Sequence, residues 1–171
     1  MSNSLTIEEM RLSPNAKRAA HWVKNAHPDI VFTSGRRSAR DQAHAMAVNV
    51  HRYGMVWLHD TYKNQDMVDS LTRWMTAHLD LTSDVASIAQ GFYETLMTEQ
   101  VGQLAQFPHC RGDAFDIACP TYADGNINEL AVLAIRRAIE QVPIECGLQL
   151  VLTHEGAHRI IHAQFAPSAE V

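Results

Sequence analysis

The sequence has no long apolar run, no excess of basic residues and few cysteines. No stretch of its 171 residues approaches the roughly 20 consecutive apolar residues that a membrane-spanning helix needs. Lysine and arginine total 14 against 19 aspartates and glutamates, a formal net charge of −5, which argues against a general nucleic-acid binder. The three cysteines are an odd number without a C-x-x-C pair, which favours a reducing compartment over a disulfide framework.

The N-terminus lacks the basic segment followed by an apolar segment that marks a secretory signal peptide. We therefore expect synthesis in the cytoplasm and no stable insertion into a membrane. With 46% hydrophobic and 19% charged residues, the composition is ordinary for a globular protein, and the chain is long enough to bury a core. We expect one domain over residues 1–171, and a monomer.

Hydrophobic periodicity predicts an α+β fold, with a small antiparallel sheet packed by helices. The expected helices are residues 14–27, 36–53 and 128–137. The expected strands are residues 30–33, 114–118, 148–152 and 159–165. In the helix that begins at Asn128, the residues expected to face inward are Leu130, Leu133, Ala134 and Ala138.

Residues from about 60 to 104 show no strand-like alternation, so we predict an additional helical insertion there. Thr82-Ser83-Asp84 divides this block into two helices. A helical hairpin packed on the core is the simpler interpretation. A substrate lid is the alternative, because the block directly precedes the first of two motifs that combine histidine with acidic residues.

The two motifs place histidines and carboxylates at spacings that suit a metal ion. The first runs from His109 to Asp116, and the second is His154-Glu155-Gly156-Ala157-His158. Zinc binds imidazole nitrogen and carboxylate oxygen, and a catalytic zinc typically has three protein ligands and a water. His109, Asp116 and His158 would supply these three ligands, and Glu155 would remain as a general base.

The surroundings of the motifs support a metal site on the sheet. Asp116 interrupts an otherwise apolar strand, where an unpaired carboxylate is costly to bury, so a metal or an arginine is expected beside it. A solvated carboxylate at a strand end is the alternative. Gly112 can supply the bend inside the first motif. Alternation after His158 puts His158 and His162 on one face of a strand, although a His-x3-His pair on a helix remains an alternative.

Both motifs resemble those of the zinc D-Ala-D-Ala metallopeptidase family. The matching pattern is His109-x-x-Gly112-x-Ala114-x-Asp116, followed by Glu155-x-x-His158. A further segment similar to the family is Ser34-Gly35-Arg36-Arg37-Ser38, with Asp41-Gln42 after it. The chain departs from the family pattern at Arg36, where an aromatic residue is usual, and at Ile160, where a second histidine is common.

The resemblance assigns roles to single residues. It makes His109, Asp116 and His158 the zinc ligands. The role of general base falls to Glu155, and Arg37 becomes the cation that steadies a substrate carboxylate or transition-state charge. Two further candidates for contact with the substrate or the developing oxyanion are His162 and Gln42.

The family includes phage L-alanyl-D-glutamate endopeptidases, which are endolysins, together with D-Ala-D-Ala carboxypeptidases and dipeptidases. The resemblance therefore implies a zinc metallopeptidase that hydrolyses an amide bond in the stem peptide of peptidoglycan. Without a signal peptide, we rank a phage endolysin of the L-Ala-D-Glu type first, with holin-mediated release to the cell wall. A carboxypeptidase or dipeptidase ranks second. A non-catalytic, zinc-stabilised wall-binding or virion module is a distant third, and it would require a closed site with His162 or His154 as fourth ligand.

Overall fold

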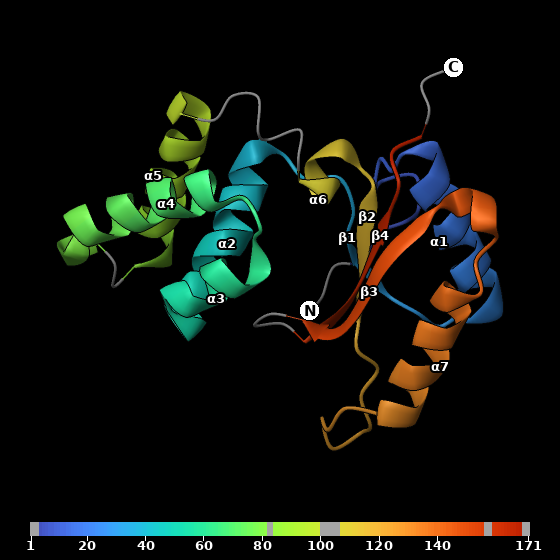
Figure 1. The fold of residues 1–171 in the computed structure, drawn as a ribbon. Helices are drawn as coiled ribbons and strands as arrows, with labels where there is room; N and C mark the ends of the chain where they lie inside the picture. Colours follow the sequence, from blue (N-terminus) through green and yellow to red (C-terminus); the bar gives the residue numbers. More distant parts are fainter. Residues whose placement is uncertain (1–3, 82–83, 100–106, 156–158, 169–171) are drawn as a thin grey trace. The chain divides into compact units, whose positions relative to one another are not determined.

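The computed structural model describes residues 4–81, 84–99, 107–155 and 159–168, and its class is α+β, as expected. Figure 1 labels the helices and strands along the chain. The helices are α1 (Pro14–Ala26), α2 (Ala39–Tyr53), α3 (Met55–Thr61), α4 (Gln65–Ala77), α5 (Val85–Glu99), α6 (Pro108–Arg111) and α7 (Glu129–Glu140), with short 3-10 turns at Leu79–Leu81 and Ile144–Cys146. The strands are β1 (Phe32–Ser34), β2 (Ala114–Ala118), β3 (Leu148–Glu155) and β4 (Ile160–Phe165).

The four strands form one antiparallel sheet in the order β1-β2-β4-β3. In the central pair, Asp116 of β2 lies directly opposite His162 of β4. The outer side of β1 is bridged by Leu5, whose N–H donates to the carbonyl of Phe32 at 3.0 Å. The opposite edge of the sheet is β3, which extends three residues beyond the strand predicted from sequence and ends at Glu155.

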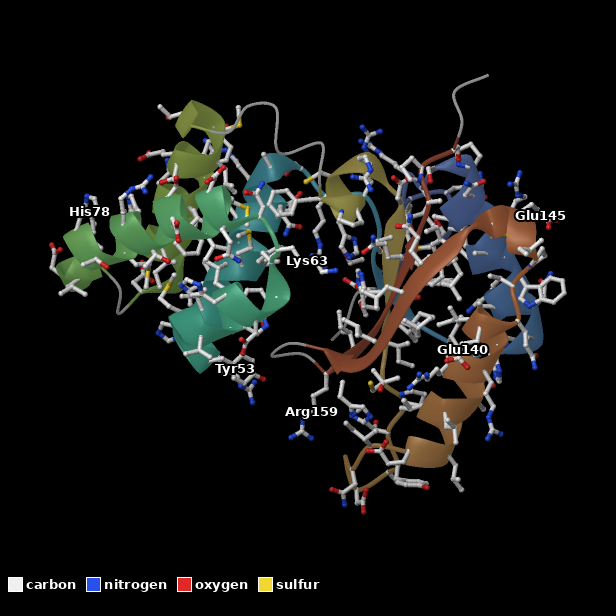
Figure 2. All side chains as sticks on the ribbon, in the orientation of Figure 1. Tyr53, Lys63, His78, Glu140, Glu145 and Arg159 are labelled. Carbon is white, nitrogen blue, oxygen red and sulfur yellow. The ribbon has the colours of Figure 1, made fainter. Side chains whose placement is uncertain are left out.

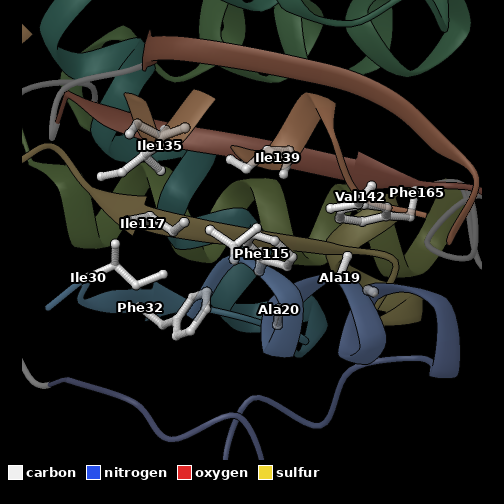
Figure 3. Close-up of a cluster of buried hydrophobic side chains, with 14 of the residues drawn as sticks. Ala19, Ala20, Ile30, Phe32, Phe115, Ile117, Ile135, Ile139, Val142 and Phe165 are labelled. Carbon is white, nitrogen blue, oxygen red and sulfur yellow. The ribbon is translucent and has the colours of Figure 1, made fainter. Parts of the chain in front are cut away.

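One face of the sheet is covered by α1 and α7, and the first hydrophobic core lies beneath them (Figure 3). Because side chains alternate along a strand, every second residue of β2 and β4 enters this core. Its largest members include Phe32, Phe115, Ile117, Ile135, Ile139, Ile161 and Phe165. The alternate residues of β2 and β4 therefore project from the other face.

The prediction for the buried face of α7 is wrong for three of its four residues, and only Ala138 is buried as expected. Leu130 and Leu133 are 77% and 42% exposed, and Ala134 is exposed as well. The residues that face the core are Val132, Ile135, Ala138 and Ile139. This helix has two apolar stripes that differ by one residue, about 100° around its axis, and the sequence alone does not distinguish them. The stripe with the two isoleucines is the one that packs on the sheet.

The chain divides into two compact units, with Arg37–Cys110 as one and the residues before and after this segment as the other. The 37–110 unit has its own hydrophobic core, in which α2 packs with the two helices expected in the insertion, α4 and α5. Its fully buried members include Met46, Leu58, Val68, Leu71, Ile88, Phe92 and Leu96. The expectation of one peptidase domain over residues 1–171 stays a prediction. So do both interpretations of residues 60–104, a helical hairpin packed on the core and, as the alternative, a substrate lid.

No helix in the described parts of the chain is both long enough and apolar enough to cross a membrane.

Candidate metal site

His109 is held on the four-residue helix α6 and is 6% exposed. The backbone N–H of Arg37 donates to the carbonyl of His109 at 3.0 Å. Just before α6, Phe107 packs edge to face on Tyr62, with ring centroids 5.6 Å apart. These contacts hold the carbonyl of His109 and the segment that leads into α6.

Gly112 makes the bend between α6 and β2 that the sequence predicts. Its φ is 84°, a conformation that residues with a side chain rarely adopt. A Cβ atom at this position would lie 2.9 Å from the carbonyl oxygen of Arg11, so the space is also closed to a side chain. Beyond the bend, Asp113 is buried and pairs with the Nε of Arg111 at 2.6 Å.

Asp116 and His162 meet across the two central strands. The carboxylate oxygen Oδ1 of Asp116 lies 2.9 Å from Nδ1 of His162, and the residues are 1% and 8% exposed. Burial of a carboxylate is costly without a polar or charged partner, so the imidazole compensates part of that cost. The pair projects from the sheet face that does not carry the α1–α7 core.

His109 joins this pair, and one ligand atom from each of the three residues lies within 4.8 Å of the others. Tetrahedral zinc, with nitrogen and oxygen ligands at about 2.0–2.2 Å, keeps its ligand atoms about 3.3 Å apart. A contraction of at most about 1.5 Å would close the group around an ion, a movement within the reach of side-chain rotation. Within the described residues, no other set of three His, Cys, Asp or Glu side chains is this close.

The donor set fits a catalytic ion. Two imidazoles and one carboxylate bind zinc and leave a coordination position open for water or substrate. The same set also suits ferrous iron, so the geometry alone does not select the metal. We refer to His109, Asp116 and His162 as the metal group.

The third ligand predicted from sequence, His158, lies outside the described residues, and its role stays a prediction. Glu155 is the last residue of β3, opposite Ile160, and the position of its side chain is also outside the description. His162 was expected to contact the substrate or the developing oxyanion, whereas the structure places it with His109 and Asp116, two of the expected ligands. The alternation after His158 was the signal that pointed to it.

Arg37 and Gln42 are the two remaining site residues predicted from sequence. The backbone N–H of Arg37 donates a hydrogen bond to the carbonyl of His109. The side chain of Gln42 is 4% exposed and donates to the hydroxyl of Tyr62 at 3.1 Å. The contacts of both residues with substrate stay predictions.

A second polar cluster lies near the C-terminal end of β3. Nε2 of His154 is 3.0 Å from the carboxylate of Glu129, so His154 has another partner and is not a member of the metal group. Burial raises the pKa of the Cys119 thiol; the backbone N–H of His154 and the cation of Arg159 partly oppose this rise, and the charge of Glu129 adds to it. Figure 2 shows Arg159 projecting outward just before β4.

Comparison of this chain with protein-family models, with curated proteins and with solved structures finds no match. The resemblance to the zinc D-Ala-D-Ala metallopeptidases therefore depends on the motifs in the sequence.

Proposed function

We propose that this protein is a zinc-dependent peptidoglycan peptidase, of the phage endolysin type, that cuts an amide bond of the L-Ala-D-Glu kind in the stem peptide. The observation that carries the proposal is the buried metal group of His109, Asp116 and His162. Two of its three members are residues that the sequence motif marks as ligands. A D-Ala-D-Ala carboxypeptidase or dipeptidase, with the same chemistry on another bond, is the alternative.

The composition of the metal group favours catalysis over a structural role. Structural zinc sites are usually closed by four ligands, most of them cysteines. The metal group has three members among the described residues, and none is a cysteine. The distant alternative of a zinc-stabilised binding module would need a fourth protein ligand.

In the proposed mechanism, the metal ion and the protein side chains have separate roles. A bound zinc would supply Lewis-acid chemistry, which polarises the substrate carbonyl and makes water more acidic. His109, Asp116 and His162 would hold the ion and orient its open position. Glu155 would take a proton from the attacking water and pass it to the leaving amine, a role worth about 10²–10⁴-fold in rate.

A charged group beside the scissile bond would complete this arrangement. The backbone N–H of Arg37 is hydrogen-bonded to the carbonyl of His109, so Arg37, which carries a cation, is held next to a metal ligand. Fixed charges near a developing oxyanion stabilise the transition state more than the ground state. We assign Arg37 this role.

The test is digestion of purified peptidoglycan by the metal-loaded protein, with new amino and carboxyl termini identified by mass spectrometry. We expect new termini between L-alanine and D-glutamate, and about one zinc per chain. Asp116→Asn should lose metal and activity, whereas Asp124→Asn, in an exposed turn of the same unit, should keep both. Glu155→Gln should keep zinc and lose at least about 10²-fold in turnover.

Several outcomes would refute the proposal. Intact peptidoglycan after incubation with zinc-loaded protein would remove the peptidase assignment. Iron bound in place of zinc, with no new termini, would favour an oxygen-dependent reaction of the two-histidine, one-carboxylate type. Wild-type cleavage by Asp116→Asn would place the reaction elsewhere in the chain.

A further inference from the structure

The strand β3 has an irregular register just before Glu155. Leu152 pairs with His162 of β4. The next registered pair is Glu155 with Ile160, so three steps along β3 correspond to two steps along β4. Two residues of β3 therefore lie opposite a single residue of β4. Such a β-bulge adds one residue to a strand, and bulges next to active sites often re-aim a side chain.

The bulge decides which residue of β3 takes a place on the sheet face that carries Asp116 and His162. We refer to this face as the metal face. Side chains alternate along β4, so Ile160 belongs to the same face as His162, and paired residues of an antiparallel sheet share a face. In the bulged register, the position opposite Ile160 belongs to Glu155. Without the extra residue, His154 would take this position, and Glu155 would move to the other face.

His154 has the backbone conformation that such a bulge requires. Its φ is 62°, in the left-handed region that residues with a side chain seldom adopt, although histidine adopts it more readily than most. In one common type of bulge this place belongs to glycine, which has no steric penalty there. The backbone of His154 is therefore strained, and strain of this kind persists only where surrounding contacts hold the residue.

Contacts with two neighbouring segments hold His154. Its Nε2 lies 3.0 Å from the carboxylate of Glu129, the first residue of α7. Its backbone N–H donates to the sulfur of Cys119, which directly follows β2. Helix α7 is anchored in the core through Val132 and Ile135, so its first turn gives the histidine a fixed support.

We propose that His154 is a positioning residue, which keeps Glu155 in register on the metal face. Glu129 would hold His154 in the conformation that this register needs. The inference rests on the proposed function, in which Glu155 is the general base. A slip of one residue would turn the base away from the metal face, because the period of a strand is two. Misplacement of a catalytic group by about 1 Å can already cost about 10²-fold in rate.

The register can be measured in the metal-free protein, through nuclear Overhauser contacts between backbone protons of β3 and β4. Wild-type protein should show the contact between Glu155 and Ile160. His154→Val should move this contact from residue 155 to residue 154, because a β-branched side chain strongly disfavours a positive φ. His154→Gly should keep the wild-type contact, since glycine adopts this conformation without strain. Leu150→Val, at another exposed position of β3, is the control and should keep it as well.

Turnover should follow the register. We expect His154→Val to lose at least about 10-fold in kcat, with KM and bound zinc unchanged, and His154→Gly to stay within about threefold of wild type. In the Glu155→Gln background, His154→Val should add no further loss, because its effect acts through the base.

Glu129→Gln tests the support of His154 from α7. The pair is exposed, so the variant should fold normally and lose about two- to fivefold in kcat, the range of an exposed ion pair. Glu140→Gln, at an exposed position near the other end of α7, is the matched control and should keep wild-type kcat.

The outcomes separate this inference from the proposed function. If wild-type protein cleaves peptidoglycan but His154→Val keeps the contact between Glu155 and Ile160, the function stands and the positioning role is wrong. If His154→Val moves the contact but wild-type protein cleaves nothing, control of the register stands and the peptidase assignment is wrong.

Two further results would overturn the positioning role. Additive losses from His154→Val and Glu155→Gln would show a general structural effect that does not act through the base. If His154→Val does not fold, Glu129→Gln decides the question, and wild-type register and kcat in that variant would refute the inference.

Discussion

At the scale of single residues, the pairing of Asp116 with His162 gives a direct test of the third metal ligand. His162 is buried beside Asp116, and its ligand atom lies within 4.8 Å of those of His109 and Asp116. Removal of one of three ligands should weaken zinc more than the 10–100-fold that is typical of outer-shell changes, so we expect a loss of more than about 100-fold in His162→Ala. Bound zinc would be measured by mass spectrometry after dialysis against a chelator series.

Two further variants complete this prediction. His158→Ala should keep zinc if His162 is the third ligand, and His21→Ala, at an exposed position on α1, is the control for loss of a histidine. Zinc loss in His158→Ala with zinc retained in His162→Ala would restore the ligand set predicted from sequence. Loss in both variants would indicate a four-ligand site and favour the structural alternative.

Cys119 allows a second test at this scale, through its altered pKa. Burial raises the pKa of its thiol, and only the thiolate reacts with alkylating reagents. We therefore expect that alkylation by iodoacetamide, followed by peptide mass spectrometry, has its pH midpoint higher in the folded protein than in the urea-unfolded chain. Because the charge of Glu129 contributes to the rise, Glu129→Gln should lower the midpoint in the folded protein, and Glu140→Gln should leave it unchanged. A lower midpoint in the folded protein would contradict this.

At the scale of elements, the sequence predicts strands better than it predicts which side of a helix is buried. A strand has a period of two, so a single acidic residue among apolar ones, as with Asp116, sets the face of the whole strand. On α7, a shift of one residue gives another apolar stripe, and only the tertiary contact decides between Leu133 and Ile135. The face of β2 that carries the metal group was therefore predictable, and the buried face of α7 was not.

The limits of α2 and α3 show the effect of local hydrogen bonds on element boundaries. The predicted helix from 36 begins at Ala39 in the structure, because Ser38 and Asp41 form a reciprocal capping box. Gly54 ends α2 as expected, and a further helix, α3, begins directly after it. No strong apolar period marks this short helix in the sequence, and its one buried residue is Leu58.

The N-cap of α7 provides the test at this scale. The side-chain oxygen of Asn128 accepts a hydrogen bond from the backbone N–H of Ala131 at 3.1 Å. Loss of such a cap costs about 1 kcal/mol, with a range of about 0.5–2 kcal/mol, so Asn128→Ala should lower the free energy of unfolding by this amount. The measurement is urea denaturation followed by circular dichroism.

Asn25→Ala on α1 is the control, because Asn25 is exposed within a helix and alanine has the higher helix propensity. This variant should be neutral or slightly more stable. Equal stability of Asn128→Ala and the wild-type protein would show that water replaces the cap without loss.

At the scale of the whole molecule, the structure contains two separate hydrophobic cores, which composition and periodicity did not reveal. The sequence predicted an insertion at about 60–104, but the compact unit is Arg37–Cys110 and includes α2. The reason is that α2 contributes Ala43, Met46 and Val50 to the same core as Phe92. A helix that looks like part of the catalytic scaffold in sequence is thus packed with the helices that follow it.

The two cores predict different responses to the same substitution. Phe92 and Phe115 are fully buried, one in each core. Phenylalanine to alanine in a core costs about 3–5 kcal/mol, so each variant should lose that much stability in its own unit. Local unfolding follows such compact units, so hydrogen exchange measured by mass spectrometry should report them separately. Phe92→Ala should accelerate exchange in α2, α4 and α5, whereas Phe115→Ala should accelerate it in the sheet, α1 and α7.

A second part of the same experiment compares hydrogen exchange with and without zinc. An ion that binds only the folded metal group stabilises it by mass action, so zinc should slow exchange in β2 and β4 of the wild-type protein. In Phe92→Ala, zinc should leave the rapid exchange of α4 and α5 in place, since Asp116 and His162 lie on β2 and β4, in the other compact unit. If Phe92→Ala instead accelerates exchange in the sheet and α7 as much as in α4 and α5, the two cores unfold as one cooperative unit. The single-domain prediction made from the sequence would then describe the folding behaviour of this chain better than its division into two units.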